Sequence, residues 1–263
     1  MPDEDQTDDG ESVLDLFDDY YHIPALAVVF ALMLWVRLQA YDAFVRDGQV
    51  VFSGNDAWYH LRQVNYSVRN WPGTMPFDPW TNFPYGTSAG QFGTLYDQIV
   101  ATVALVVGLG APSELLVAKT LLVAPTVFGA LAIIPVFLIG RRIAGRGAAL
   151  FGVGVLALLP GTFLQRTLVG FADHNGAEPF FMGMSVFALL VAIGVAVRER
   201  PVWHLVQERN WDELRSPTVP SAPAGFAVAM YMWMWPPGAL PVRIFVFLLS
   251  TSPSPPHRHN PRL

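Results

Sequence analysis

The chain has no cysteine, a single lysine and few charged residues for its length. The absence of cysteine excludes a disulfide framework and a thiolate metal site. Charged residues make up 14% of the 263 residues, whereas roughly 25% is typical of soluble proteins. Hydrophobic residues reach 52% and the mean hydropathy is +0.37. These values exclude an ordinary soluble domain. They predict an all-α polytopic protein of the cell membrane, whose partners include the lipid bilayer that surrounds it.

The charges that are present are unevenly distributed. Lys119 is the only lysine, and the first 20 residues hold nine acidic side chains. We therefore expect residues 1–22 to form a solvated acidic tail on the cytoplasmic side. An acidic excess with almost no lysine is typical of a high-salt organism, a halophile, although nucleotide bias produces the same skew. The net charge of −5 disfavours a nucleic acid as partner.

A multi-helix membrane domain is predicted over residues 23–249. About 20 apolar residues are needed to cross a bilayer as a helix. Five segments meet this requirement, namely Ile23 to Tyr41, Leu115 to Gly140, Gly147 to Gln165, Pro179 to Val197 and Ala224 to Leu249. A sixth, Gln98 to Ala111, has only 14 residues and suits an interfacial or re-entrant helix.

Basic residues predict the orientation of these helices. Two short loops are basic, one with Arg141, Arg142 and Arg146 and one with Arg198, Arg200 and Arg209. The positive-inside rule places both in the cytoplasm. The loop over residues 42–114 is then external, and so is the short loop between Gln165 and Pro179. Asp56 and Asp173 would therefore share the extracytoplasmic face.

The end of the chain changes composition abruptly. Residues 250–263 are rich in Pro, Ser, His and Arg. Two interpretations stay open, a disordered basic tail or the product of a frameshifted or prematurely ended gene.

Two polar clusters adjoin the apolar segments. Asn55-Asp56-Ala57-Trp58-Tyr59-His60 follows the first, and Asp173-His174-Asn175-Gly176-Ala177-Glu178 lies between the third and the fourth. Acidic residues at a membrane edge are costly and usually serve chemistry or transport. Each has a structural alternative, since Asp56 is a fair helix N-cap, Asp173 suits a turn and Glu178 could simply flank the next helix.

The residue types in these clusters suit a hard divalent cation. Carboxylate oxygens with an Asn oxygen or a His nitrogen are typical ligands of Mg²⁺ or Mn²⁺. Such an ion could act as a Lewis acid on a lipid phosphate leaving group. The pattern therefore predicts a metal held by Asp56 and Asp173, with an Asn oxygen or a His nitrogen beside them.

The order of three motifs resembles the N-terminal part of the archaeal oligosaccharyltransferase catalytic subunit. The motifs are Asp56-Ala57-Trp58-Tyr59-His60-Leu61-Arg62, then Gln165 to Asn175, then Tyr231-Met232-Trp233-Met234-Trp235-Pro236-Pro237-Gly238. The resemblance covers roughly residues 20 to 240. It implies a C-type glycosyltransferase-like helical bundle with a long first external loop. The implied reaction moves an oligosaccharide from a dolichyl phosphate or pyrophosphate carrier to asparagine in an Asn-X-Ser/Thr sequon of an acceptor protein.

The resemblance also implies roles for individual residues. Asp56 matches the acidic ligand of the first loop and Asp173 the first acid of the second motif, so both are candidate catalytic and metal-binding residues, with Arg166 as a further catalytic candidate. Asn175 stands where the family often has His or an acid, so the resemblance implies that Asn175 is the third metal ligand beside Asp56 and Asp173. His174, Glu178 and His60 are candidates for contacts to the substrates.

Parts of the family's pattern are not found in these residues. The family has further crossings with a third acidic ligand and a large C-terminal domain that reads the sequon. We therefore expect an incomplete copy that is inactive alone. Two rival functions stay open, a polytopic membrane transporter and another glycosyltransferase of the same fold that acts on a different lipid-linked sugar.

Overall fold

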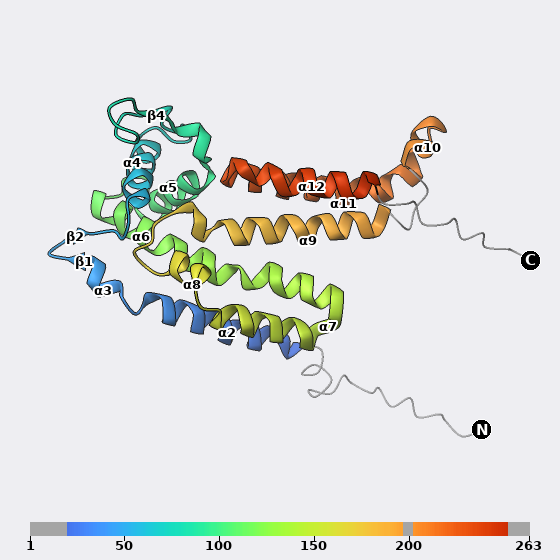
Figure 1. The fold of residues 1–263 in the computed structure, drawn as a ribbon, viewed down its shortest axis with the longest axis horizontal. Helices are drawn as coiled ribbons and strands as arrows, with labels where there is room; N and C mark the ends of the chain where they lie inside the picture. Colours follow the sequence, from blue (N-terminus) through green and yellow to red (C-terminus); the bar gives the residue numbers. More distant parts are fainter. Residues whose placement is uncertain (1–19, 197–201, 252–263) are drawn as a thin grey trace, which may run out of the picture.

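The computed structural model describes residues 20–196 and 202–251. They form an elongated bundle of helices, with several short helices and strands gathered at one end (Figure 1). We call that end the loop end. The predicted acidic tail up to residue 19 lies outside the described residues, and so do residues 252–263 of the predicted C-terminal segment.

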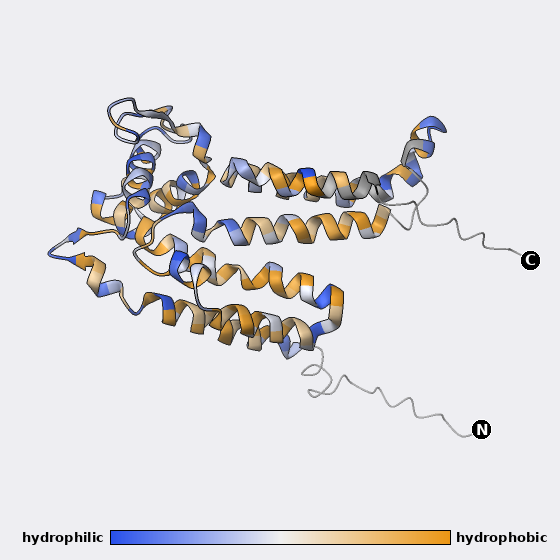
Figure 2. Cartoon of the chain, in the orientation of Figure 1, coloured by the Kyte–Doolittle hydropathy of each residue, from blue (hydrophilic) through white to orange (hydrophobic). Residues whose placement is uncertain are grey.

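Long apolar helices make up the body of the bundle. They are α2 (His22–Leu38), α6 (Glu114–Leu131), α7 (Ile133–Leu158), α9 (Glu178–Ala196) and α11 (Trp211–Met234). Three stretches have the length and composition to cross a membrane, His22–Phe44, Glu114–Leu158 and Glu178–Ala196. Apolar residues cover α2, α6 and α9 along most of their length (Figure 2), as expected of segments that face lipid and one another. The prediction of an all-α membrane fold is confirmed.

The long stretch Glu114–Leu158 is two antiparallel arms rather than one rod. Gly145 has φ 84° and ψ 178°, a conformation that ends a helix, and it lies within α7. A Cβ added to Gly140 would lie 3.0 Å from Ala149 Cα, so the arms pack against each other at the turn. The chain reverses here, at the end opposite the loop end (Figure 1). The two predicted crossings, Leu115 to Gly140 and Gly147 to Gln165, correspond to these arms.

Two predicted boundaries are wrong. The second arm ends at Leu158, because Pro160 and Gly161 (φ 93°) break it before the short helix α8 (Thr162–Thr167). The predicted crossing from Ala224 to Leu249 is also broken. Its first part belongs to α11, and the 3₁₀ turn η3 (Pro236–Gly238) separates this helix from α12 (Ala239–Thr251). The two prolines of η3 lack the N–H groups that a continuous helix needs. The short helix α10 (Val202–Gln207) precedes α11.

Short elements from the long loop are gathered at the loop end. In chain order they are α3 (Tyr41–Phe44), β1 (Val45–Arg46), β2 (Gln49–Val50), α4 (Asp56–Arg69), β3 (Phe77–Asp78), β4 (Thr87–Ser88), η1 (Ala89–Phe92) and α5 (Leu95–Val107). β1 pairs with β2, and β3 pairs with β4, both antiparallel. α5 has only 13 residues and is too short to cross a bilayer. The predicted short helix is therefore present, at Leu95–Val107 rather than at Gln98 to Ala111, and its place at the membrane surface stays a prediction.

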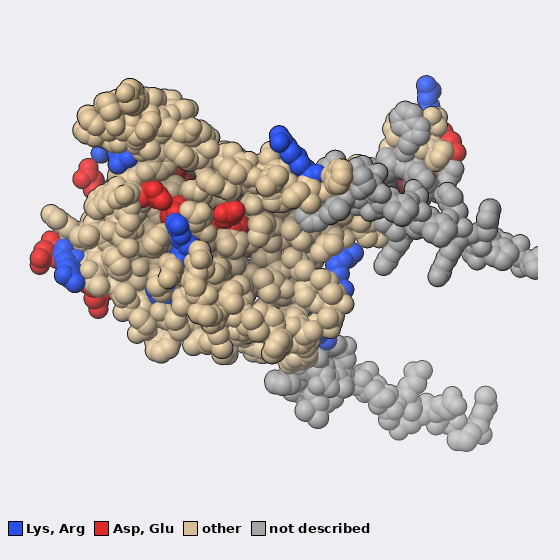
Figure 3. Space-filling model, in the orientation of Figure 1, with Lys and Arg blue, Asp and Glu red and all other residues tan. Residues whose placement is uncertain are grey.

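The core of the loop end lies between α4, α5 and α6. α4 buries one face with residues spaced by three and four positions, including His60, Val64 and Ser67. This face packs against α5 and α6 around a cluster that contains Tyr96 and Leu121. A second cluster joins α2 to α6 and α7. On the face that Figure 3 shows, charged side chains lie at both ends of the molecule and in one mixed group over the body between them.

The end of α11 is fastened to the segment before α5. The amide of Thr94 donates to the carbonyl of Trp233 at 3.3 Å, and the Trp233 indole donates to the Thr94 hydroxyl at 2.8 Å. A Cβ on Gly93 would lie 2.5 Å from the Met234 carbonyl oxygen, so only glycine permits this approach. These contacts bring Trp235 to the loop end.

The segment from Leu168 to Ala177, which contains the second polar cluster, is held by backbone hydrogen bonds to α2 and to the first loop. The amide of Val169 donates to the carbonyl of Arg37 at 3.1 Å, and the amide of Ser53 donates to the carbonyl of Gly170 at 2.9 Å. The buried Arg37 side chain also donates to Thr167 Oγ1 at 2.8 Å. The first loop, α2 and this segment are therefore fastened to one another.

Replacing Gly170 by alanine should destabilise the fold. Gly170 has φ +96°, and an added Cβ would lie 2.4 Å from the Phe44 ring. Both the backbone strain and the clash cost free energy, together about 2 kcal/mol or more. Thermal unfolding in detergent should show a midpoint several degrees lower for Gly170→Ala. In the control Gly154→Ala, a Cβ meets nothing within 4 Å in a helix, so its midpoint should stay or rise. Equal midpoints for the two variants would contradict this account.

Candidate active site at the loop end

A cavity of about 570 Å³ opens at the loop end. Its walls come from the start of α4, the segment after β3, the 3₁₀ turn η2 (His174–Gly176) and the end of α11. The lining residues are Asn55, Asp56, Trp58, Tyr59, His60, Arg62, Trp80, Thr81, Asn82, Phe92, His174, Asn175 and Trp235. Both polar clusters of the sequence therefore contribute to one cavity.

Asp56 is the first residue of α4, and its side chain is exposed at the cavity. The N-cap position belongs to Asn55, whose side chain makes no capping hydrogen bond. The alternative of Asp56 as N-cap is thus not what the structure shows. Negative charge is favoured at a helix N-terminus, so the fold tolerates this carboxylate while leaving its oxygens accessible.

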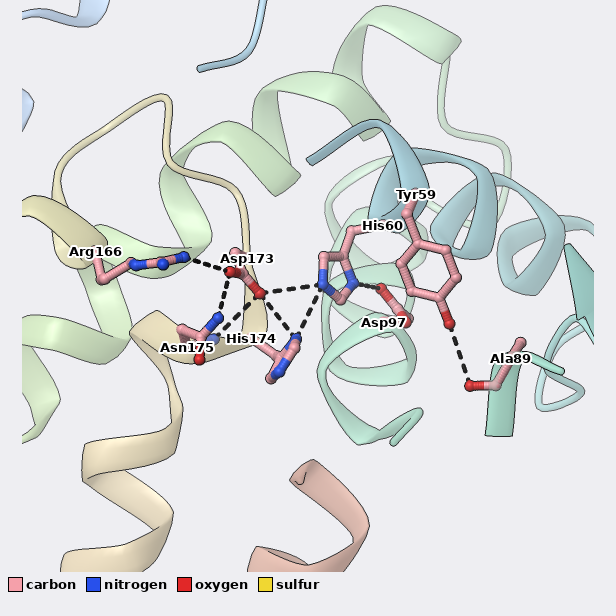
Figure 4. A network of polar contacts seen from close by, with 8 residues as sticks. All are labelled: Tyr59, His60, Ala89, Asp97, Arg166, Asp173, His174 and Asn175. Carbon is pink, nitrogen blue, oxygen red and sulfur yellow. Dashed lines mark hydrogen bonds and ion pairs between the residues drawn. The ribbon is translucent and has the colours of Figure 1, made fainter. Parts of the chain in front are cut away.

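Asp173 is buried directly behind the cavity wall and receives several hydrogen bonds (Figure 4). Its Oδ2 accepts from Arg166 Nη1 at 3.1 Å and from the side-chain amide of Asn175. Its Oδ1 lies 2.8 Å from His174 Nδ1 and 3.4 Å from His60 Nε2. Asp173 also caps η2, since the amide of Asn175 donates to Oδ1 at 3.3 Å. The turn alternative is therefore correct, and the same carboxylate joins four functional candidates.

Hydrogen bonds keep Asp173 ionised. Burial alone would raise its pKa, but hydrogen bonds from His174 and His60, with their charges, hold the pKa of Asp173 well below its usual range. The neighbouring Arg166 side chain adds a cation that is half-buried and stacks over the Phe171 ring at 4.8 Å. The site thus contains a fixed negative charge surrounded by donors.

His60 joins Asp173 to a third acid, Asp97. His60 Nδ1 lies 2.7 Å from Asp97 Oδ1, and both side chains are buried. Burial would lower the pKa of His60, but the two carboxylates of Asp97 and Asp173 outweigh it and raise the pKa to about 10. Burial raises the pKa of Asp97, and His60 opposes this shift. His60 therefore bridges two buried carboxylates that come from different parts of the chain.

His174 is sandwiched between His60 and an aromatic wall. Its ring stacks on Trp235 with centroids 4.6 Å apart and planes at 28°. Its Nδ1 lies 3.1 Å from His60 Nε2, whereas its Nε2 has no hydrogen-bond partner among the described residues. The stacking fixes the ring, and the remaining contacts hold Nδ1 toward the buried side of the site.

Glu178 lies apart from the other predicted site residues. It begins α9, is half-buried and accepts a hydrogen bond from the Tyr231 hydroxyl at 3.4 Å. It does not line the cavity. The fold thus brings Asp56, His60, His174 and Asn175 to one cavity, places Asp173 and Arg166 behind them, and leaves Glu178 at a helix joint.

Three donor atoms of the site could hold a metal ion together. His60, Asp173 and His174 each offer one ligand atom, all within 4.8 Å of one another and all from buried residues. Two imidazole nitrogens with one carboxylate are a common ligand set for divalent transition metals. The residues present therefore fit a divalent ion, although two of these donors differ from the set predicted by sequence.

An ion pair supports the opposite wall of the cavity. Arg62 donates to the buried Asp78 through Nε at 3.1 Å and Nη2 at 2.6 Å, and Thr81 also donates to Asp78 at 2.6 Å. These hydrogen bonds hold the pKa of Asp78 below its usual range although burial opposes them. The pair anchors the segment with Trp80 and Thr81 against α4.

Asp97 and the ion pair of Arg62 with Asp78 are not among the site residues predicted from the sequence. Asp97 is the single charged residue of the apolar helix α5, and an isolated acid in such a helix is a signal of function. The pair of Arg62 and Asp78 carries no such signal, because salt-bridge partners 16 residues apart cannot be matched without the fold.

Comparison with known proteins identifies the family. The profile of the family "Oligosaccharyl transferase STT3, N-terminal" matches residues 25–252. The chain belongs to this family. This membership confirms the resemblance of the three sequence motifs to the archaeal oligosaccharyltransferase catalytic subunit.

Named relatives agree with this assignment. The chain is 64% identical over 249 residues to the dolichyl-monophosphooligosaccharide–protein glycotransferase AglB of Haloferax volcanii, covering 95% of this chain and 24% of that protein. It is 29% identical over 224 residues to the dolichyl-phosphooligosaccharide-protein glycotransferase 3 of Archaeoglobus fulgidus, covering 84% of this chain and 24% of that protein. The chain thus spans about a quarter of the length of these STT3 relatives.

Solved structures share the fold. The oligosaccharyltransferase AglB of Archaeoglobus fulgidus in complex with an inhibitory peptide and a dolichol-phosphate has a TM-score of 0.74 at 27% identity, with 89% of this chain and 26% of that chain covered. A structure of the same organism's enzyme with Zn and sulfate has a TM-score of 0.70 at 26% identity, with 86% and 26% covered. The membrane fold of this chain is therefore that of the STT3 N-terminal region.

Loss of the Arg62 side chain should destabilise the loop end. Arg62→Ala leaves Asp78 buried without its ion partner, which costs on the order of 2 kcal/mol when the arginine is partly exposed. The unfolding midpoint in detergent should fall by several degrees. The double variant Arg62→Ala with Asp78→Asn removes the uncompensated charge and should recover part of the loss. No recovery would show that Arg62 acts through packing alone.

The same pair should make stability depend on acidity. The folded-state pKa of Asp78 is lowered, so its ionised form stabilises the fold above the ordinary pKa of about 3.8. This contribution is lost as the pH falls below that value and Asp78 takes up a proton. Between pH 6 and pH 3 the unfolding midpoint of the wild-type chain should fall more steeply than that of Asp78→Asn. Parallel curves would contradict the assignment.

Proposed function

We propose that this chain forms the membrane-embedded catalytic part of an enzyme that transfers an oligosaccharide from a dolichyl phosphate or pyrophosphate carrier to asparagine in Asn-X-Ser/Thr sequons. The observation that carries the proposal is the cavity at the loop end, where exposed Asp56 faces a second cluster built around buried Asp173. A lipid-linked donor needs such a polar site at the end of a membrane bundle. The STT3 relatives, named as glycotransferases, support the same reaction class.

The side of the membrane follows from the basic turn of the bundle. Arg141, Arg142 and Arg146 lie at the turn between the arms of Glu114–Leu158, at the end opposite the cavity. The positive-inside rule favours the cytoplasm for this turn. The cavity then opens on the extracytoplasmic side of the cell membrane.

Asp56 is suited to act on the acceptor. An amide nitrogen is a poor nucleophile because its lone pair is delocalised into the carbonyl. An exposed carboxylate can accept a hydrogen bond from the amide N–H, orient the nitrogen and favour its attack. Asp56 is the acidic side chain that lines the cavity within the described residues.

The phosphate of the donor needs positive charge. Arg166 supplies a half-buried guanidinium in contact with Asp173, and the buried rings of His174 and His60 line the cavity wall. Arg166, and His174 through Nε2, can donate hydrogen bonds to phosphate oxygens as negative charge develops on the leaving group. Glu178 would act indirectly, by holding the start of α9 through Tyr231.

A divalent ion, Mn²⁺ or Mg²⁺, would complete this site. The sequence favours Asp56, Asp173 and Asn175 as its ligands, and Asp56 and Asn175 do line one cavity. When bound, the ion would neutralise the departing phosphate as a Lewis acid. Hydrogen bonds from His174 and His60 lower the pKa of Asp173 and so favour the ionised form that a cation needs.

Replacing Asp56 should abolish transfer without unfolding the protein. The test is Asp56→Asn in cells whose only copy of the full-length protein carries the substitution, with in-gel staining of cell-surface glycoproteins as readout. N-glycosylation should fall at least 100-fold. The matched control is Asp42→Asn, an exposed carboxylate of the same loop that does not line the cavity, which should glycosylate normally.

Other outcomes separate the rival functions. Unchanged glycosylation in Asp56→Asn would remove this carboxylate from the reaction. Unchanged glycosylation in a deletion strain would remove the oligosaccharyltransferase assignment altogether. Loss of ion flux across vesicles with unaffected glycosylation would instead favour a transporter.

A further inference from the structure

A second hollow lies beside the cavity at the loop end, along the outer face of α4. It has a volume of about 450 Å³. Arg62 and Trp80 line both this hollow and the cavity, so the two adjoin each other at these side chains. We call the second hollow the α4 groove. The site residues predicted from the sequence do not line it, and the proposed reaction makes no use of it.

A row of side chains along α4 supplies most of the groove. The row consists of Arg62, Asn65, Tyr66, Arg69 and the C-cap residue Asn70. These positions recur every three or four residues, so they share one side of the helix. The opposite side is buried and carries His60, Val64 and Ser67. At a rise of about 1.5 Å per residue, the row extends about 12 Å from the rim of the cavity to the end of α4.

The two asparagines of the row offer hydrogen-bond acceptors. The amide nitrogen of Asn65 donates to the carbonyl of Leu61 at 2.9 Å, and the amide nitrogen of Asn70 donates to the carbonyl of Tyr66 at 2.9 Å. The amide oxygens accept no hydrogen bond from the described residues. Each asparagine therefore has its nitrogen fixed on the helix and its oxygen left for a ligand.

The two arginines of the row add donors without adding net charge. Arg62 is paired with the buried Asp78, and Arg69 Nη2 lies 3.3 Å from Glu114 Oε1. Arg69 and Glu114 are both exposed, and such pairs are weak, so Arg69 can turn its N–H groups toward a ligand. Because each cation has its own carboxylate, the groove does not select for an anion. Its mixture of donors and acceptors suits neutral hydroxyl groups instead.

Aromatic rings complete the groove. Trp80 is 67% exposed at the junction with the cavity, and the half-buried Tyr66 lies in the middle of the row. The C–H groups on the face of a sugar ring pack well against the negative face of an aromatic ring. Exposed aromatic rings beside amide and guanidinium groups therefore match a carbohydrate chain.

We propose that the α4 groove binds the outer sugars of the donor oligosaccharide, those that follow the sugar attached to the carrier phosphate. The inference rests on the proposed function, which places the phosphate-linked sugar in the cavity, so that the rest of the sugar chain must leave across the rim. The groove begins at that rim, at Arg62 and Trp80. A polypeptide is a poorer match. Peptides are bound mainly by pairing with a strand edge or by apolar grooves, whereas the α4 groove is a helix face of polar side chains.

The position of the groove has a consequence for kinetics. Contacts made there lie away from the bonds that form and break, so they stabilise the bound donor and the transition state equally. Such contacts lower KM and leave kcat unchanged. The groove should therefore make long donors bind more tightly than short ones without speeding the chemical step.

The test compares two dolichyl-linked donors isolated from native membranes, one with a single sugar and one with three or more. The full-length protein in detergent transfers each of them to a fluorescent peptide that contains an Asn-X-Thr sequon. For the long donor, Asn65→Ala should raise KM about 5-fold, as expected for one lost hydrogen bond, and Tyr66→Ala about 10-fold, both with unchanged kcat. The ratio of the KM of the short donor to that of the long donor should fall by the same factors.

The matched control is Gln39→Ala. Gln39 is an exposed amide that also donates to the carbonyl four residues earlier, that of Trp35 at 3.0 Å, and it lines neither the groove nor the cavity. Its KM ratio should equal that of the wild-type protein. A wild-type ratio in both Asn65→Ala and Tyr66→Ala would overturn the proposal.

A second measurement uses the wild-type protein and stays decisive even if a groove variant fails to fold. Met75 and Tyr66 line the groove but not the cavity, so their oxidation by hydroxyl radicals, measured by mass spectrometry, reports on the groove alone. The long donor should lower the oxidation of both side chains at least 3-fold, and the single-sugar donor should not. Equal protection by the two donors, or protection by the acceptor peptide in place of the long donor, would overturn the proposal.

The same experiments separate this inference from the proposed function. Protection by the long donor without transfer of either donor would remove the proposed reaction and leave sugar binding in the groove standing. Normal transfer with both reporter side chains unprotected would do the reverse.

Discussion

The structure of the loop end depends on the burial of Asp173 as a charged group. A carboxylate that is 1% exposed stays ionised only when donors surround it, and here they come from His60, Arg166, His174 and Asn175. His60 belongs to the first loop, and the other three belong to the segment between α7 and α9. The hydrogen bonds of this one buried carboxylate therefore fix the first loop against the segment between α7 and α9.

Backbone hydrogen bonds also hold the first loop against the segment that carries Asp173. The hydrogen bond from Ser53 to Gly170 and the one from Val169 to Arg37 tie the first loop and α2 to the segment that carries Asp173. Since the cavity lies between these parts, its shape follows from contacts outside its own walls. The residues that line it can then be polar without endangering the fold, because the apolar clusters of α4, α5 and α6 supply the packing. The candidate site residues and the residues that pack the core are thus largely separate groups.

Much of this arrangement could be predicted from the sequence. Apolar runs predicted the long helices, and basic loops predicted their relative directions. The motifs around Asp56 and Asp173 predicted the family and the position of the candidate site. Periodicity could not place the break at Trp235 to Gly238, because the apolar composition continues through it. The hydrogen-bond partners of Asp173 could not be predicted from the sequence either. His60 and Asp97 are 37 residues apart, and His60 and His174 are 114 apart, so only the folded chain brings them together.

The attachment of α11 to the segment before α5 has a consequence for biosynthesis. Trp235, which stacks on His174, reaches the cavity only because Trp233 and Thr94 bind each other across 139 residues. Every other residue that lines the cavity lies at position 175 or earlier in the chain. The cavity wall formed by Trp235 can therefore be completed only after all the other lining residues have been synthesised.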